Sequence, residues 1–255
     1  PLVRSLFTPD EGCQWACLDY SQQEPRVLVH YANLRKLRGA DKVVAEYNDD
    51  ADTDFHQVVA DLAGIPRKQA KTINLGMFYG MGIWKLSQEL GMEQVDAKPI
   101  FEQYHDRVPF VRKLSYECTQ SANNKGYIRT LLGRHRHFNL FEPADSRNTW
   151  PNRETPLNRE AAMEVWKDRP LRRSFTHKAL NALIQGSSAD MTKKAMLDLY
   201  EEGIIPHITV HDELDFSVED SVQANKYRDI MEHCVDLTVP LKVDVELGSN
   251  WGDIK

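Results

Sequence analysis

The chain has 255 residues, 41% of them hydrophobic and 27% charged, and its formal net charge is −6. These proportions are ordinary for a globular protein of one or two domains, and the negative charge excludes a protein that coats nucleic acid with its whole surface. No apolar run approaches the ~20 residues of a membrane span, the N-terminus lacks the pattern of a secretory signal, and four scattered cysteines indicate reduced thiols. We therefore expect a cytoplasmic protein that does not associate with a membrane.

The first predicted strand is a short apolar run over residues 15–18 that ends at Asp19. A carboxylate in that position lies at the edge of a sheet, where it can meet a cation. Pro25 suits the first turn of a following helix, predicted over residues 26–37. An acidic stretch comes next, and a second, short helix is predicted over residues 55–63.

Four side chains at successive i, i+4 positions mark the next helix, and they are Arg67, Lys71, Leu75 and Tyr79. Each step of four residues drifts only ~40° around a helix, so the four share one face. A helix that packs on a core keeps its charges away from its aromatic side chains, whereas this one lines them up. Such a face suits a ligand with a polyanion at one end and a flat ring at the other. The plain alternative is a surface helix with a chance stripe.

Three further helices are predicted at residues 83–90, 98–104 and 110–123. Residues 126–136 alternate apolar and basic side chains, which indicates a strand or a hairpin around Gly133. Residues 141–169 are polar, contain several prolines and show little periodicity, so we interpret them as an excursion or long loop.

A long helix is predicted over residues 175–202. Two apolar runs follow it, at residues 204–210 and 214–218, and predict a β-hairpin that carries His211, Asp212 and Glu213 at its tip. A helix over residues 222–237 and a strand over residues 241–247 complete the predicted elements.

Two aspartates far apart in the sequence, Asp19 and Asp212, each follow a short apolar strand. If those strands are neighbours, two carboxylates meet at one sheet edge, and a pair of hard divalent cations is the usual counter-charge. Two solvated loop aspartates are the alternative. Arg67 and Lys71 favour the metal site, because they supply the positive face that a triphosphate requires. Metal-binding carboxylates together with a phosphate-binding helix indicate in-line phosphoryl transfer.

Three stretches resemble, in the correct order, the motifs of the family A DNA polymerases, the bacterial DNA polymerase I group and its phage relatives. LDYSQQEPR at residues 18–26 resembles motif A, residues 67–80 resemble the fingers-helix motif B, and VHDEL at residues 210–214 resembles motif C. HKALNALIQGSSAD at residues 177–190 resembles the stretch before motif C. The resemblance covers nearly the whole chain apart from the polar excursion.

The resemblance implies an α+β fold with an antiparallel palm sheet and a mostly helical fingers subdomain inserted into it. The palm is then expected at residues 1–50 and 179–255, and the fingers at residues 51–178. No thumb and no exonuclease are expected in this chain, so the resemblance further implies a C-terminal polymerase part whose partner is an N-terminal chain with the thumb and the remaining palm. It also places the protein in the cytoplasm of a bacterium or of a phage-infected cell.

The resemblance assigns the metal site to Asp19, Asp212 and the backbone carbonyl of Tyr20. These groups would hold two Mg²⁺ ions, with Mn²⁺ as a substitute. Glu213 would be an auxiliary catalytic carboxylate.

The implied nucleotide site uses side chains from motifs A and B and from the helix before motif B. Arg67, Lys71 and His56 would contact the triphosphate of a dNTP, and Lys71 would also protonate the pyrophosphate leaving group. Tyr79 would lie against the nascent base pair, and Glu24 would exclude a ribose 2′-hydroxyl. Gln22 and Leu75 complete the predicted nucleotide site.

The implied partner is primer–template DNA. Asn181 and Gln185 would reach minor-groove acceptors that all base pairs share, and His211 would sit beside the primer terminus. Arg134 and Arg136 would hold template phosphates, and His177 is a further predicted DNA contact.

The implied reaction is template-directed addition of dNMP to a primer 3′-hydroxyl with release of pyrophosphate. Three departures from the family pattern stand out: Leu75 replaces an aromatic residue, and Gln23 and Pro25 replace aliphatic residues. The competing functions are a two-metal nuclease, which would need no triphosphate-binding helix, and a non-catalytic DNA-binding subunit of a replication complex. A single-subunit RNA polymerase is disfavoured by Glu24.

Overall fold

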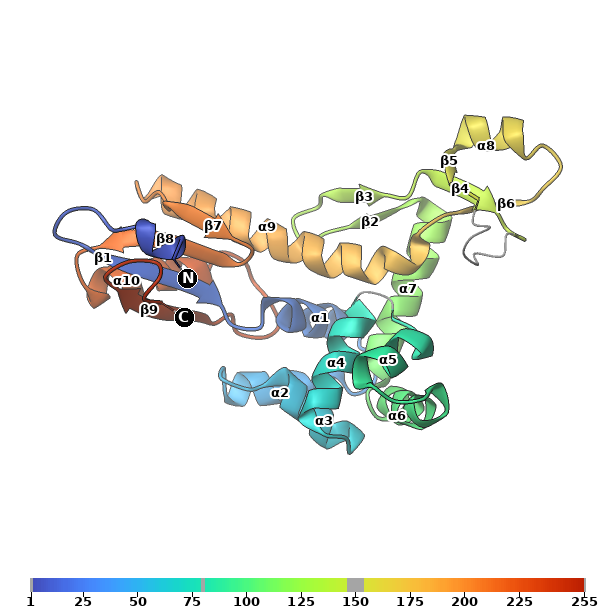
Figure 1. The fold of residues 1–255 in the computed structure, drawn as a ribbon, viewed down its shortest axis with the longest axis horizontal. Coiled ribbons are helices and arrows are strands. Elements are labelled where there is room, and N and C mark those ends of the chain that lie inside the picture. The colour runs from blue at the N-terminus through green and yellow to red at the C-terminus, as the bar shows by residue number, and fades with distance from the viewer. Residues whose placement is uncertain (1, 79–80, 146–153, 255) are drawn as a thin grey trace. The chain divides into compact units, whose positions relative to one another are not determined.

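We describe the protein from a computed structural model, which covers residues 2–78, 81–145 and 154–254 (Figure 1). The chain forms two compact units. The sheet unit comprises Pro1–Val58 and Ser187–Lys255, and the helical unit comprises Val59–Gly186. The chain passes from one unit to the other within α3 (Phe55–Ala63) and returns within α9 (Ala179–Glu201). Among the described residues, none of the helices combines the length and the apolar character that a membrane crossing requires.

The sheet unit contains a four-stranded antiparallel sheet in the order β7-β8-β1-β9. Its strands are β1 (Gln14–Tyr20), β7 (Ile208–Val210), β8 (Glu213–Val218) and β9 (Val243–Gly248). The predicted first strand, the hairpin and the C-terminal strand are therefore confirmed. The four residues from Trp15 to Leu18 are all buried, as expected for an interior strand.

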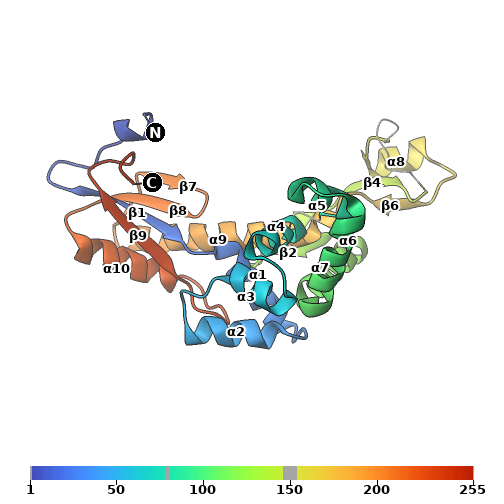
Figure 2. The ribbon, with the colours of Figure 1, turned by 60° about the horizontal axis from the view of Figure 1, so that its bottom comes forward.

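The sheet unit also contains helices, and both ends of the described chain lie in it (Figure 2). They are η1 (Arg4–Leu6), α1 (Gln23–Leu34), α2 (Ala40–Asp49) and α10 (Ser221–Glu232), with parts of α3 and α9. Helix α10 packs beside β9 and β8. The sequence analysis did not predict α2, which buries Val43 and Tyr47, one helical turn apart, within an otherwise polar stretch.

A buried guanidinium ties three loops of the sheet unit together. Arg26 in α1 is 0% exposed and donates hydrogen bonds to the backbone carbonyls of Ser21 (2.8 Å), Pro240 (2.6 Å) and Ala51 (2.6 Å). The guanidinium also lies over the ring of Tyr47, 4.6 Å from the centroid. Burial lowers the pKa of Arg26, but a guanidinium stays protonated in a protein. Its five donors are thus largely satisfied inside the fold.

The helical unit begins with four helices: α4 (Arg67–Phe78), α5 (Ile83–Leu90), α6 (Gln94–Arg107) and α7 (Pro109–Lys125). The fully buried hydroxyl of Tyr104 in α6 donates a 2.5 Å hydrogen bond to Oδ1 of Asn74, which is also fully buried, in α4. This bond holds the buried side of α4 against α6. Helix α7 is followed by Gly126, whose φ of 79° is readily adopted by glycine.

The predicted hairpin around Gly133 is confirmed: β2 (Tyr127–Arg129) pairs with β3 (His135–His137). In contrast, of the two interpretations given for residues 141–169, an excursion or a long loop, the long loop is wrong for the described part of that stretch. The chain there forms a small sheet in the order β5-β4-β6 with one helix. Its elements are β4 (Leu140–Pro143), β5 (Leu157–Asn158), α8 (Arg159–Val165) and β6 (Leu171–Arg173). Strands of two to four residues are too short to show a period in the sequence.

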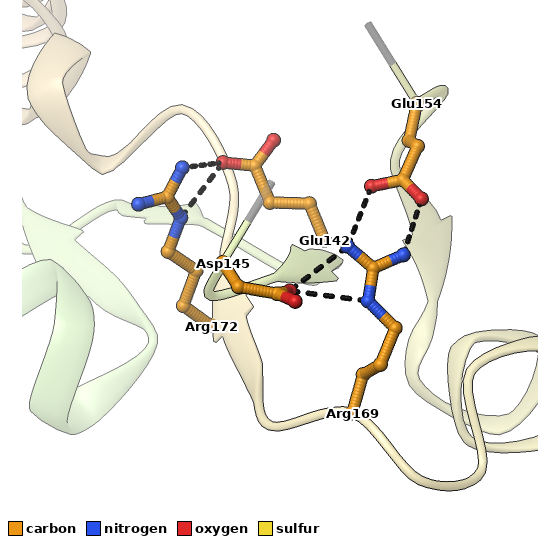
Figure 3. A network of polar contacts seen from close by, with 5 residues as sticks. All are labelled: Glu142, Asp145, Glu154, Arg169 and Arg172. Atoms are coloured by element: carbon orange, nitrogen blue, oxygen red, sulfur yellow. Dashed lines mark hydrogen bonds and ion pairs between the residues drawn. The ribbon is translucent and has the colours of Figure 1, made fainter. Parts of the chain in front are cut away.

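Ion pairs hold this excursion together (Figure 3). Arg169 bridges Glu154 (Nη1–Oε1, 2.5 Å) and Asp145 (Nη2–Oδ1, 2.8 Å). Arg172 pairs with the buried Glu142 across β4 and β6 (Nη2–Oε1, 3.0 Å). The polar composition of this segment favoured the loop interpretation, yet its charged side chains are the groups that order it.

We expect Arg26→Met to lower the free energy of unfolding by about 3 kcal/mol or more, because three backbone carbonyls would lose their donor inside the fold. Urea denaturation followed by circular dichroism measures this. Arg38→Met, which changes an exposed arginine after α1, is the matched control and should stay within about 0.5 kcal/mol of the parent. Equal midpoints for the two variants would contradict the structural role of Arg26.

We expect Arg169→Met to loosen the excursion without unfolding the rest of the chain. Amide hydrogen exchange in α8 and β6 should speed up, whereas Lys167→Met, at an exposed neighbouring site, should leave it unchanged. Hydrogen bonding to Arg169 lowers the pKa of Asp145, so the protection should be present near neutral pH and be lost as pH falls through that lowered pKa. Unchanged exchange in Arg169→Met would refute this account of the ion pairs.

Candidate active site

Strand pairing brings the two predicted metal-binding aspartates to one end of the sheet. Asp19 in β1 lies opposite Glu213 in β8, and the backbone N–H of Tyr20 donates to the carbonyl of Asp212 at 3.3 Å. The two aspartates are therefore on adjacent backbone segments, as the sequence analysis expected. The turn consists of His211 and Asp212, whereas Glu213 is already the first residue of β8 rather than part of the tip. His211 has a φ of 56°, which is uncommon for a residue with a side chain.

The electrostatics of this edge favour a bound cation. Burial raises the pKa of Asp212, a backbone hydrogen bond and His211 oppose the rise, and the nearby carboxylate of Glu213 adds to it. A carboxylate in such a place is held in its charged form by a positive partner. Asp19, Asp212 and the Tyr20 carbonyl offer oxygen atoms only, which is the donor set that hard divalent cations such as Mg²⁺ prefer. The residues therefore fit the predicted metals chemically.

Glu213 takes part in a second cluster on the same face of the sheet. One ligand atom each from Cys17, Glu213 and Asp215 lie within 4.8 Å of one another. Burial raises the pKa of the Cys17 thiol and of the Asp215 carboxyl, and Glu213 adds to both rises. Sequence reasoning missed Cys17 and Asp215. The signal was available, because side chains two apart on a strand face the same way, as Cys17 does with Asp19 and Asp215 with Glu213.

A cavity lies over this face of the sheet, and its lining includes residues of the proposed metal site and of the second cluster. It is lined by Arg4, Cys17, Asp19, Glu213, Asp244, Glu246, Trp251 and Ile254. The indole Nε1 of Trp251 donates to Oε1 of Glu213 at 3.2 Å, and the guanidinium of Arg4 lies 4.4 Å from the centroid of the Trp251 ring. Trp251 thus fixes one oxygen of Glu213 and leaves its other oxygen for a further contact.

Three residues of the motif A stretch lie at the start of α1: Gln22 and Glu24, which are predicted nucleotide contacts, and Gln23, which departs from the family pattern. Gln22 uses its side chain inside the fold: Nε2 donates to the Thr53 carbonyl (3.1 Å) and Oε1 accepts from the Phe55 N–H (2.9 Å). Gln23 is buried and donates to Thr192 Oγ1 at 3.2 Å, which accounts for a polar residue in an aliphatic position. Glu24 lies half-buried in the first turn of α1. These contacts position the helix start; nucleotide contacts by Gln22 and Glu24 stay predictions.

His56 lies in the first turn of α3 and is only 8% exposed. Asp54 caps this helix, because its Oδ1 accepts from the backbone N–H of His56 (2.9 Å) and of Gln57 (3.3 Å). The His56 ring lies edge-on to that of Phe55. The triphosphate contact predicted for His56 remains a prediction.

The predicted stripe on α4 is present and faces outward. Arg67, Lys71 and Leu75 are all exposed, while Ala70 and Ile73, on the other side of the helix, are fully buried. The fourth member of the stripe, Tyr79, lies outside the described residues. A cationic exposed face on a helix anchored by its inner face is consistent with an anion-binding surface.

The predicted DNA contacts lie in both units. In the helical unit, Arg134 Nη2 donates to the Gly186 carbonyl at 2.8 Å, and Arg136 is exposed on β3. Asn181 and Gln185 are one turn apart on α9, and the buried Nδ2 of Asn181 has no hydrogen-bond partner. Two exposed histidines complete the set, His177 in η2 (Thr176–Lys178) and His211 in the sheet unit.

Comparison with known proteins identifies the family. The family model for DNA polymerase family A matches residues 2–253. A DNA-directed DNA polymerase of Pseudomonas phage M6 is 37% identical, with 98% of this chain and 40% of the relative covered. DNA polymerase I of Bacillus caldotenax is 34% identical, with 99% of this chain and 28% of the relative covered.

A solved structure, the POL domain of Pol1 from M. smegmatis in complex with DNA primer–template and dNTP, matches with a TM-score of 0.74 and 30% identity. The match covers 98% of this chain and 42% of the M. smegmatis chain. The chain thus spans less than half the length of each of these relatives. The match over residues 2–253, together with the shared fold, shows that the chain belongs to DNA polymerase family A.

Proposed function

We propose that this chain provides the catalytic and nucleotide-binding part of a template-directed DNA polymerase, in which the sheet unit is the palm and the helical unit is the fingers. The reaction is attack of a primer 3′-hydroxyl on the α-phosphate of a dNTP, with release of pyrophosphate. The observation that carries the proposal is the pairing of Asp19 with Glu213 and of Tyr20 with Asp212, which joins motif A to motif C at one sheet end.

The metal-binding groups are the carboxylates of Asp19 and Asp212 with the backbone carbonyl of Tyr20. When bound there, two Mg²⁺ ions, or Mn²⁺ in their place, would lower the pKa of the attacking hydroxyl and neutralise charge on the leaving oxygen. Glu213 acts as a positioning carboxylate, since Trp251 holds one of its oxygens.

The nucleotide is bound by the exposed stripe of α4. Arg67 donates in a bidentate manner to the phosphates, and Lys71 supplies a point charge and the proton for the pyrophosphate. Leu75 lies against the sugar, and Tyr79 is a contact of the nascent base pair. His56 is a further triphosphate contact, Glu24 excludes a ribose 2′-hydroxyl, and Gln22 orients the start of α1 beside it.

Primer–template DNA is the macromolecular partner. Arg134 and Arg136 contact template phosphates, and His177 and His211 contact the DNA near the primer end. Asn181 and Gln185 donate to minor-groove acceptors. The unpartnered buried Nδ2 of Asn181 supports this role, since a donor without a partner is costly unless a ligand supplies one.

We further propose that an N-terminal polymerase segment with the thumb and the remaining palm works with this chain, in the cytoplasm of a bacterium or a phage-infected cell. The support is that the chain spans only 40% of the length of the phage relative.

Asp19→Asn and Asp212→Asn should each reduce templated primer extension with Mg²⁺ and four dNTPs by at least about 100-fold, because each removes a negative charge from the metal site. Asp236→Asn, an exposed aspartate in the same unit, should retain parental activity. The assay is run with the chain alone and with the N-terminal segment of the phage relative added in trans. Absence of synthesis in both formats would refute the proposed function.

Lys71→Ala should lower kcat/KM for dNTP by about 10- to 100-fold, the effect of losing a charge-assisted hydrogen bond. Lys68→Ala, which removes an exposed lysine from outside the stripe, is the matched control. Steady-state incorporation of a single nucleotide measures kcat/KM for the parent and for both variants. A similar loss in the two variants would mean that α4 acts through general charge rather than through the stripe.

A further inference from the structure

The face of the sheet beside the proposed metal aspartates carries a second set of ligand atoms. Cys17 in β1 lies directly opposite Asp215 in β8, and Glu213 is two residues before Asp215 on the same face. One thiol sulfur and one oxygen from each carboxylate lie within 4.8 Å of one another. The cluster includes neither Asp19 nor Asp212.

An indole N–H orients each carboxylate of the cluster. Trp15 Nε1 donates to Asp215 Oδ1 at 3.1 Å, and Trp251 Nε1 donates to Glu213 Oε1 at 3.2 Å. Hydrogen bonds of this kind to one oxygen are typical of the partners that orient metal-ligating carboxylates, because they leave the second oxygen for the ion.

The second oxygen of Asp215 has no partner outside the cluster. Asp215 is 0% exposed, and its Oδ2 makes no hydrogen bond to a group outside the cluster, within which Cys17 and Glu213 are its polar neighbours. A buried carboxylate oxygen without a donor is costly, and the cost is greater with a second carboxylate a few ångströms away. A cation held between Asp215, Glu213 and Cys17 would remove this cost.

We propose that Cys17, Glu213 and Asp215 form a binding site for one divalent cation of the zinc type, separate from the two metals of DNA synthesis. The thiolate selects Zn²⁺ over Mg²⁺, because Mg²⁺ prefers oxygen donors alone. Ligand atoms on a tetrahedral Zn²⁺ are roughly 3.5 Å apart, given bonds of about 2.0–2.3 Å, so small side-chain rotations suffice from the present spacing.

The fourth ligand position faces the cavity. Glu246 in β9 lies opposite Cys17 in the register and lines that cavity, so it or a water molecule completes the coordination. The ion would link β1 to β8 close to Asp19 in β1 and to Asp212 in the turn before β8. It would thus stabilise the pairing on which the proposed active site depends, and its binding can be measured whether or not the chain synthesises DNA.

The test uses Co²⁺ as a spectroscopic substitute for Zn²⁺ on the whole chain after chelator treatment. Coordination of Co²⁺ by a thiolate gives a near-ultraviolet charge-transfer band. We expect this band in the parent and in Asp212→Asn, and its loss in Cys17→Ser. Cys13→Ser, at a half-buried cysteine four residues earlier, is the matched control and should keep the band. Zinc affinity, measured against a chromophoric chelator, should fall at least about 100-fold in Cys17→Ser and in Asp215→Asn.

No band in the parent, or an undiminished band in Cys17→Ser, would overturn the proposal. Loss of the band in Asp212→Asn would also overturn it, because the ion would then belong to the synthesis site. Circular dichroism checks that each variant is folded. If Asp215→Asn does not fold, Cys17→Ser decides alone, since serine keeps the size of the side chain and removes the soft ligand.

Discussion

The antiparallel pairing of β1 with β8 is the constraint on which the rest of the sheet unit depends. It joins two segments that lie at opposite ends of the sequence and sets a register in which Asp19 faces Glu213 and Cys17 faces Asp215. A slip of β8 by one residue would turn Glu213 and Asp215 to the other face of the sheet, away from Asp19 and Cys17. The burial of the apolar residues of β1 therefore fixes, at the same time, which carboxylates meet.

Much of this arrangement could be predicted from the sequence, because long elements leave a clear pattern. The strand that leads to Asp19 and the hairpin around Asp212 appear as continuous apolar runs, and the helix with Arg67 and Lys71 appears as side chains repeated every four residues. The excursion at residues 141–169 leaves no such pattern, since its strands have two to four residues and Arg169 and Arg172 hold it by ion pairs. Cys17 and Asp215 were missed for another reason. Each strand alone places Cys17 on the face of Asp19 and Asp215 on the face of Glu213, but the meeting of Cys17 with Asp215 depends on the register between the strands, which no local window contains.

Several residues assigned by family resemblance also have contacts that shape the backbone. Gln22 binds the loop before α3 with both ends of its amide, and Asp54 caps the helix that carries His56. A substitution at Gln22 would consequently move the start of α3 as well as remove a polar group from the proposed site. Activity measurements on such positions need a structural readout before a loss is attributed to nucleotide contact.

The place of β1 in the sequence also determines when the sheet can form during synthesis. β1 is made well before its partners β8 and β9, which end at residues 218 and 248. Pairing between such distant segments is slow, because a long loop must close first. The apolar residues of β1 consequently stay without their native neighbours until β8 and β9 have been made. That interval is the period in which the nascent protein is most exposed to aggregation and most dependent on chaperones.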